Sequence, residues 1–183
     1  MSVQVVYETH STSEDNELGF ATGWLGGTLS PVGREQARQL GQRRRNDGVD
    51  IVIASDLNRA VETAQIAFGD SGLPIQLDWR LRECNYGAMN GMPRSQLDTE
   101  RHLRLDKPFP GGESWREAVE RVSLFLGDLT KEQEGQRVVL IGHVAPRWAL
   151  DHIVDGQPLE ELLDAPFHWR EGWEYTLVEP LTR

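Results

Sequence analysis

Nearly continuous runs of apolar residues recur along the chain and are separated by longer segments with helical periodicity. Three of these runs, Val3–Tyr7, Asp50–Ser55 and Arg137–Ile141, are short and rich in β-branched residues. That combination is typical of strands that are buried on both faces. Pro74–Leu77 and Glu174–Val178 are predicted as two further short strands. Together these segments predict the strands of a sheet.

The segments between the strands carry helix start signals. Ser30 and Pro31 suit the N-cap and the first position of a helix that ends near Asp47. Leu57–Phe68 has apolar residues at helical spacing, and Ser114–Glu117 matches the capping box S-x-x-E ahead of another apolar stripe. Buried strands that alternate with helices predict an α/β fold with a mostly parallel sheet. Residues 87–112, rich in glycine and proline, are predicted to form a long excursion over one face.

Composition narrows the class of protein. At 183 residues the chain is predicted to form a single domain, 1–183. A net charge of −10 argues against partners that need a positive surface, so neither a nucleic acid nor a membrane is expected as a partner. The single cysteine, Cys84, cannot form an internal disulfide, which favours a cytoplasmic location. We find neither a signal-peptide pattern nor an apolar stretch long enough to span a membrane.

Charged and polar residues follow the predicted strands. His10, Arg59 and His143 come after the three buried strands, and Glu83 follows the short one. Ligands of open parallel sheets bind beyond the carboxyl ends of the strands, so these side chains are expected to converge. A neutral imidazole can attack phosphorus, arginine matches phosphate oxygens, and a protonated carboxyl can protonate a leaving alkoxide. The set therefore suits phosphoryl transfer.

Each of these residues also has an ordinary structural interpretation. A histidine after a strand is more often a cap or a surface residue, and Arg59 on a helix can simply pair with a carboxylate. Other chemistries lack their motifs: position 90, six residues after Cys84, is Asn rather than the arginine of a cysteine phosphatase. The sequence contains no phosphate-binding glycine loop, dinucleotide-binding motif or zinc-ligand pattern, so we expect no cofactor and no metal.

Several motifs, in order, resemble the histidine phosphatase superfamily in its phosphoglycerate-mutase-like branch. The resemblance covers roughly Val5 to Asp155. It rests on these segments: GWLGGTLSPVG from Gly23, SDLNRAVETA from Ser55, LRECNYG from Leu81, PGGES from Pro110 and GHV from Gly142. The family's opening R-H-G-E-[ST]-x-x-N corresponds here to Thr9-His10-Ser11-Thr12-Ser13-Glu14-Asp15-Asn16.

The resemblance implies a three-layer α/β sandwich and a metal-independent phosphatase for a small phosphorylated metabolite. His10 would be the phosphorylated nucleophile, Arg59 the phosphoryl-binding residue, and Glu83 the proton donor and later the base for water. His143 would stabilise the transferring charge, and Asn16 would contact the phosphate. Residues 87–112 would form part of a lid. The chain is short for the mutase branch, so the resemblance favours a phosphatase over a mutase-type phosphotransferase.

This chain departs from the family pattern at three positions. Thr9 replaces the arginine before the nucleophile, Ser11 the glycine after it, and Val144 the glycine after the second histidine. Losing one strong oxyanion donor typically costs about 10²–10³ in rate. Glu8 would add negative charge if it shared the face of His10.

Three hypotheses follow from these departures. In the first, another cation replaces the arginine of an active phosphatase, the candidates being Arg147, Arg80 and Arg82. In the second, the protein binds a phosphorylated ligand in a regulatory role but turns it over poorly. In the third, the histidine–glutamate set acts on a less charged substrate. The aromatic segment from Phe167 to Tyr175 is expected either to cover a sheet edge or to form a homodimer contact.

Overall fold

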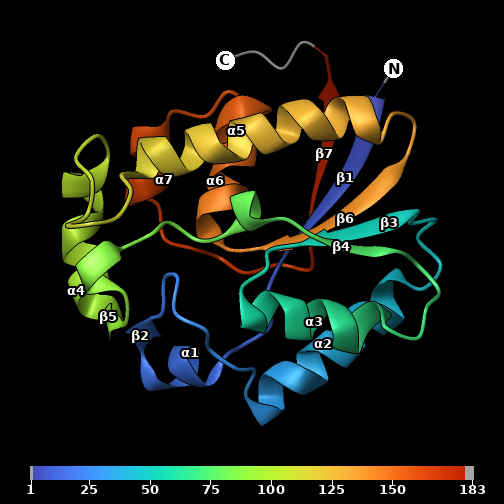
Figure 1. Ribbon diagram of the computed structural model, residues 1–183, viewed down its shortest axis with the longest axis horizontal. Coiled ribbons are helices and arrows are strands. Elements are labelled where there is room, and N and C mark those ends of the chain that lie inside the picture. Colours follow the sequence, from blue (N-terminus) through green and yellow to red (C-terminus); the bar gives the residue numbers. More distant parts are fainter. Residues whose placement is uncertain (1, 180–183) are drawn as a thin grey trace.

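The computed structural model describes residues 2–179, and its central element is a five-stranded sheet (Figure 1). The strands lie in the order β4-β3-β6-β1-β7. Neighbouring strands are parallel from β4 through β1, whereas β7 pairs antiparallel with β1. The prediction of a mostly parallel sheet is therefore confirmed. The strand bounds are β1 (Ser2–Thr9), β3 (Ile51–Ala54), β4 (Ile75–Leu77), β6 (Arg137–Gly142) and β7 (Trp173–Val178).

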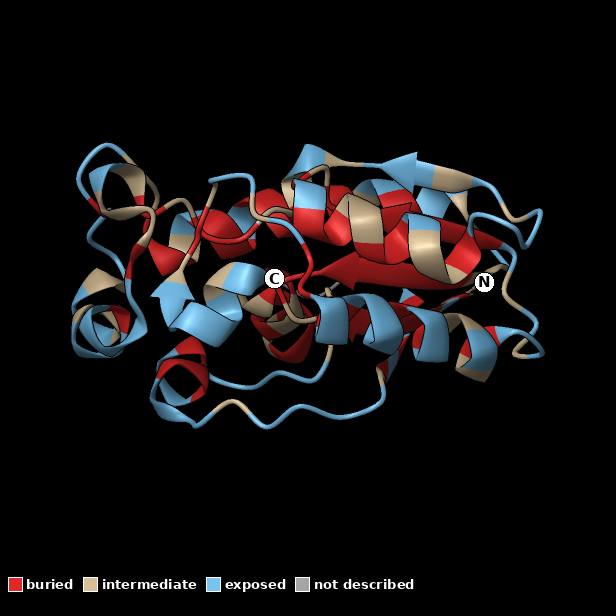
Figure 2. Cartoon of the chain, turned by 90° about the horizontal axis from the view of Figure 1, so that it is seen from below, coloured by how far each residue is buried: buried red, intermediate tan, exposed pale blue. Residues whose placement is uncertain are grey.

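Alternate residues of the central strands pack against helices on opposite faces of the sheet. In β6, Val139 and Ile141 join the core beneath two helices, and Val138 and Leu140 join the core on the other face. The result is three layers, in which the sheet is buried and the outer faces of the helices are exposed (Figures 1 and 2). One outer layer contains α2 (Pro31–Arg44) and α3 (Asn58–Phe68), and the other contains α5 (Trp115–Glu132), α6 (Val144–Ile153) and α7 (Leu159–Asp164).

The predicted helix start signals are confirmed. The Ser30 hydroxyl accepts a hydrogen bond from the Gly33 amide at 3.1 Å, and Pro31 takes the first position of α2. At the start of α5, Ser114 and Glu117 form both bonds of the capping box. Because these caps satisfy amide groups that have no partner within the helix, they fix where each helix begins.

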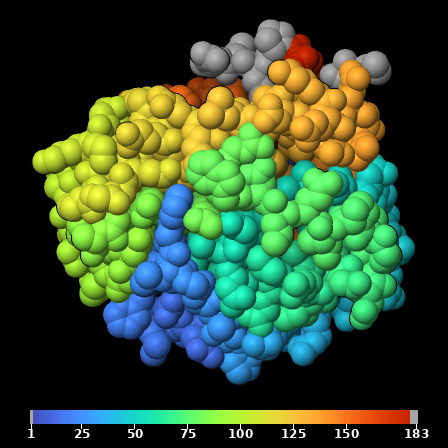
Figure 3. Space-filling view, in the orientation of Figure 1, coloured from blue at the N-terminus to red at the C-terminus, as the bar shows by residue number. Residues whose placement is uncertain are grey.

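Residues 87–112 contain more regular structure than the sequence predicted. They include η2 (Gly87–Met89), β5 (Met92–Pro93), α4 (Arg94–Glu100) and η3 (Arg101–Arg104). A second small sheet forms where β5 pairs with β2 (Phe20–Ala21), which follows α1 (Glu14–Leu18). In the space-filling view this early segment lies against the segment around residues 90–105 (Figure 3). Two distant parts of the sequence thus build one side of the molecule. The role of residues 87–112 as part of a lid stays a prediction.

The aromatic segment near the C-terminus contributes to the sheet. Trp173 and Tyr175 are buried in the core, and β7 forms the edge next to β1. The alternative of a homodimer contact remains a prediction. None of the helices within residues 2–179 combines the length and the apolar character needed to cross a membrane.

Candidate active site

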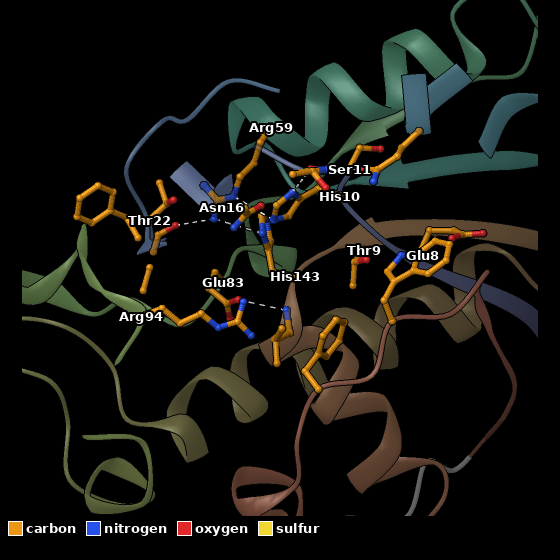
Figure 4. A pocket seen from close by; sticks show the side chains of 18 of the residues that line it. Glu8, Thr9, His10, Ser11, Asn16, Thr22, Arg59, Glu83, Arg94 and His143 are labelled. Atoms are coloured by element: carbon orange, nitrogen blue, oxygen red, sulfur yellow. Dashed lines mark hydrogen bonds between the residues drawn. The ribbon is translucent and has the colours of Figure 1, made fainter. Parts of the chain in front are cut away.

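The two histidines meet at the carboxyl end of the sheet. Thr9 and Gly142 are paired residues at the ends of the parallel strands β1 and β6, so His10 and His143 follow these strands side by side. Their ring centroids are 5.0 Å apart. Arg59 reaches them from the first turn of α3, and Glu83 faces the same cavity from the segment after η1 (Trp79–Leu81) (Figure 4). The four residues predicted to converge are therefore brought together.

His10 is held in the tautomer that a nucleophile requires. Its Nδ1 lies 2.7 Å from the Ser11 carbonyl oxygen, which can only accept, so Nδ1 carries the proton. Nε2 consequently has a free electron pair, and Arg59 Nε donates to it at 3.3 Å. Burial, and secondly the charge of Arg59, lower the pKa of His10 to about 3. The imidazole is therefore neutral and nucleophilic at neutral pH.

The same shifts predict how stability depends on pH. Burial also lowers the pKa of His143 well below its usual value. Between the folded and unfolded pKa values of a histidine, only the unfolded chain takes up the proton, so stability falls as pH drops below about 6.5. Each histidine should contribute about 1.4 kcal/mol per pH unit to this loss. Replacing His10 with Gln should remove one of the two contributions in urea unfolding at pH 7, 6 and 5.

His168→Gln serves as the control for this measurement because His168 is exposed. It should leave the slope of stability against pH unchanged. If His10→Gln kept the full wild-type slope, His10 would not be a neutral histidine in the folded protein.

Arg59 is buried and enclosed by backbone carbonyl groups. Its NH1 group donates to the carbonyl oxygens of Leu25 and Gly26 at 3.0 and 3.3 Å, and NH2 donates to that of Gly23 at 2.8 Å. Gly23 has a φ of +58°, and a Cβ there would lie 2.0 Å from the Asn90 side chain. The loop from the GW motif can therefore close around Arg59 only with glycine at that position, and it fixes the guanidinium beside both histidines.

His143 lies on the other side of the same guanidinium. Arg59 NH2 is 3.3 Å from Nδ1 of His143, and Nε2 is 2.9 Å from the Ser55 hydroxyl. Since arginine can only donate, Nδ1 accepts here and Nε2 carries the proton. The Ser55 hydroxyl can also donate to Nε2, which would place the proton on Nδ1 instead. His143 can thus become a donor toward a bound anion without taking up a charge.

Glu83 lies at the N-terminus of α6 and accepts three backbone hydrogen bonds. The Cys84 and Ala145 amides donate to Oε1 at 2.9 and 3.0 Å, and the Val144 amide donates to Oε2 at 3.2 Å. These bonds fix the carboxyl group at the cavity wall. Val144, which departs from the family pattern, therefore holds Glu83 through its backbone amide rather than its side chain.

Glu8 does not present an unbalanced charge beside His10. Its buried carboxylate pairs with Arg44 at 2.8 Å and with Arg43 at 3.3 Å. Figure 4 shows Glu8 beyond Thr9, on the side away from Glu83. Because the two arginines of α2 compensate the charge of Glu8, the expectation that Glu8 would add negative charge beside His10 is wrong. Thr9 itself lines the cavity next to His10 and brings no charge.

None of the three predicted replacement cations reaches the cavity. Arg147, also predicted as a substrate-binding residue, pairs with Asp151 at 2.6 Å and stacks on the Trp173 ring at 4.9 Å. These contacts hold it on α6 away from the site, so its predicted role is wrong.

Arg80 and Arg82 are likewise held by carboxylates. Arg80 pairs with Asp78 and Asp128 at 2.8 and 2.6 Å. Arg82 pairs with Asp56 at 2.7 Å. Neither guanidinium lines the cavity.

The remaining predicted binding residues line the cavity, although backbone bonds use part of their polar groups. The Asn16 side-chain oxygen accepts from the Ser13 amide at 3.0 Å as part of a capping box. The Ser11 amide donates to the Thr63 hydroxyl at 3.0 Å. Their contacts with a substrate stay predictions.

Sequence reasoning missed two arginines around the site. Arg94, the first residue of α4, lines the cavity, and within residues 2–179 its side chain has no ion pair or hydrogen bond (Figure 4). Its position directly after β5, in a segment predicted to be irregular, gave no signal. Arg121 is buried and donates to the carbonyl oxygens of Arg80, Arg82 and Glu83 at 2.6, 3.1 and 3.2 Å. It therefore braces the segment that carries Glu83.

The fold and this geometry define a class of protein: a phosphoglycerate mutase-like α/β protein with two histidines and an arginine at the ends of its parallel strands. The family model of the histidine phosphatase superfamily (branch 1) matches residues 9–171. The chain belongs to this superfamily. Within residues 2–179 no group of three or more histidine, cysteine or acidic side chains is placed to hold a metal ion.

Two curated relatives are named as mutases. The probable phosphoglycerate mutase GpmB of Enterobacter sp. (strain 638) is 35% identical over 149 residues, which span 77% of this chain and 69% of that protein. The 2,3-bisphosphoglycerate-dependent phosphoglycerate mutase of Thermobifida fusca (strain YX) is 41% identical over 96 residues, 50% of this chain and 39% of that protein.

Solved structures show the same fold. Bacillus stearothermophilus YhfR has a TM-score of 0.85 at 23% identity and covers 98% of this chain and 93% of its own. A mycobacterial glucosyl-3-phosphoglycerate phosphatase has a TM-score of 0.76 at 26% identity and covers 89% of this chain and 84% of its own. Both mutases and phosphatases are therefore among the proteins that this chain is similar to.

Proposed function

We propose that this chain is a metal-independent phosphomonoesterase that hydrolyses a small organic phosphate through a phosphohistidine at His10. One observation carries the proposal: the unprotonated Nε2 of His10 lies 3.3 Å from Arg59 Nε, and the His143 ring is 5.0 Å away. A nucleophile and a phosphate-binding cation thus share one enclosed site. The names of several structural neighbours, glucosyl-3-phosphoglycerate phosphatase and alpha-ribazole phosphatase, support hydrolysis.

The reaction would proceed in two balanced steps. His10 Nε2 attacks phosphorus, the N–P bond forms as the P–O bond breaks, and Glu83 gives its proton to the leaving alkoxide. Water then attacks phosphorus, Glu83 takes its proton, and the N–P bond breaks to release phosphate. Arg59 and a donating His143 stabilise the oxygens of the transferring group in both steps.

A kinetic assay tests the proposal directly. We expect wild-type protein to hydrolyse phenyl phosphate, and members of a panel of sugar phosphates and nucleotides, in the presence of EDTA. Activity that is lost in EDTA and restored by a divalent cation would contradict the metal-independent mechanism. Transfer to a second phosphoglycerate rather than to water would instead support the mutase activity for which the curated relatives are named.

The missing arginine motivates a second candidate function. With Thr9 in its place, Arg59 is the one guanidinium bonded to both histidines within residues 2–179. A protein with this site could hold a phosphorylated ligand in a regulatory role and turn it over slowly. In the phosphatase proposal Arg94 supplies additional positive charge, because it lines the cavity and its side chain is free to reach a substrate.

Thr9→Arg tests whether the missing guanidinium limits turnover, as the second candidate function requires. A second guanidinium beside the phosphoryl oxygens is expected to raise kcat/KM for phenyl phosphate by about 10- to 100-fold, since one oxyanion donor is typically worth about 10²–10³ in rate. Thr9→Met, with a long uncharged side chain, is the matched control and should give no increase. Wild-type turnover that Thr9→Arg does not improve would show that the site already has the charge it needs.

A further inference from the structure

The cavity at His10 is larger than a phosphoryl group requires. Its volume is about 540 Å³, within the range of about 300–1,000 Å³ typical of sites for organic ligands. Past Thr9, on the side away from Glu83, lies Glu8 (Figure 4), and its partner Arg43 also lines the cavity. We call the cavity-lining residues that the phosphatase mechanism does not use the second region: Gln36, Gln39, Leu40, Arg43, Phe167 and Trp169.

The second region offers aromatic rings and amide groups. Trp169 lines it although 59% of its surface is exposed, and Phe167 is half-buried beside the core. Gln36 and Gln39 lie one turn apart on α2, and within residues 2–179 the Gln39 side chain has no hydrogen-bond partner. An indole face can stack on a planar ring, and an amide can bond its heteroatoms.

A buried network holds one end of this region. Arg44 donates to Glu8 at 2.8 Å, to Asp47 at 2.7 Å and to the Glu171 carbonyl oxygen at 3.0 Å. It thereby ties the end of α2 to β1 and to the segment before β7. The end of α2 that carries Arg43 is thus held in place before a ligand binds.

The charges of the region disfavour a second anion. Arg43 is already engaged by Glu8 at 3.3 Å and lies 4.0 Å from the Glu171 carboxylate. Arg43 is therefore not free to bind a second phosphate or a carboxylate, and the exposed Glu171 carboxylate lines the same cavity. An uncharged planar group fits these surroundings better.

Thr9 lines the cavity between the histidines and Glu8 (Figure 4). It lines the cavity next to His10, and its short side chain follows Glu8, which is turned toward α2 (Figure 4). A long side chain at this position would fill the passage. We propose that Thr9 opens a specificity site for a planar aromatic or heteroaromatic group carried by the phosphate ester. The proposal rests on the proposed function for the phosphoryl end of the ligand. It also explains the absent arginine: a threonine at position 9 lacks the guanidinium charge but leaves room for the ring of the ligand.

Phosphonates test the specificity site independently of turnover, because their P–C bond is not hydrolysed. We expect wild-type protein to bind 1-naphthylmethylphosphonate more tightly than methylphosphonate in isothermal titration calorimetry. Trp169→Ala should reduce this preference about 10-fold by removing the stacking face. Trp79→Ala, at a tryptophan that is 51% exposed and outside the cavity, should leave the preference unchanged.

Variants at Thr9 test the passage itself. Thr9→Arg and Thr9→Met should both weaken naphthylmethylphosphonate binding, whereas Thr9→Arg alone should strengthen methylphosphonate binding. The specificity site is refuted if neither phosphonate binds, if the naphthyl group gives no preference in wild type, or if Trp169→Ala or Thr9→Met leaves that preference intact. Naphthyl selectivity without hydrolysis of any ester would refute the phosphatase and retain the site. Hydrolysis of phenyl phosphate without this selectivity would refute the specificity site and retain the phosphatase.

Discussion

Replacing His10 with alanine is expected to lower kcat for phenyl phosphate by roughly 10⁴- to 10⁶-fold, the loss typical of removing a covalent nucleophile. The expectation follows from the electron pair on Nε2, which Nδ1 bonding to the Ser11 carbonyl leaves free. The pKa of about 3 keeps that pair unprotonated across the working range of pH. The other histidine that lines the cavity, His143, has the proposed role of a donor to the phosphoryl oxygens rather than that of a nucleophile.

The measurement combines steady-state rates with trapping of the intermediate. Rapid acid-free quenching of wild type with a ³²P-labelled ester should yield a labelled protein that is stable to alkali and labile to acid, as expected for phosphohistidine. His10→Ala should carry no label. His102→Ala, at an exposed histidine outside the cavity, should label and turn over like wild type. Undiminished turnover by His10→Ala would exclude a covalent mechanism at this residue.

The position of the reactive residues could be predicted because each follows a signal in the local sequence. His10 and His143 come directly after buried strands, and parallel pairing of those strands brings their ends together. Arg59 and Glu83 follow from motifs of the family that the chain resembles. The carboxyl ends of a parallel sheet thus place these side chains before any tertiary contact is known.

The partners of charged side chains could not be predicted in the same way. Arg147 lies one turn after His143, yet it pairs with Asp151 on its own helix. Arg44 lies in the last turn of α2, where a cation favours the helix dipole, but it bonds Glu8 on β1. Which carboxylate pairs with which arginine depends on how segments far apart in the sequence pack together. Hydrophobic periodicity does not predict that packing.

Replacing Glu83 with glutamine should separate the two halves of the reaction. An alkyl phosphate needs a proton on its leaving alkoxide, so its kcat should fall by about 10²–10⁴-fold, the usual contribution of a general acid. The 4-nitrophenolate ion leaves without a proton. The variant should therefore keep a fast burst of 4-nitrophenol from 4-nitrophenyl phosphate, followed by slow turnover, because water has lost its base.

Phosphohistidine should consequently accumulate on Glu83→Gln and be absent from the His10→Ala/Glu83→Gln double variant. Glu17→Gln, at an exposed residue of α1 outside the cavity, is the control and should carry no more label than wild type. A glutamine at position 83 places an NH₂ group among three backbone donors, so thermal unfolding must show that the variant is folded. If a folded variant lost the nitrophenol burst as completely as alkyl turnover, Glu83 would position the phosphoryl group rather than transfer protons. An intact burst with accumulated label assigns both proton transfers to this one carboxyl, because the same residue is then needed for an alkoxide to leave and for water to attack.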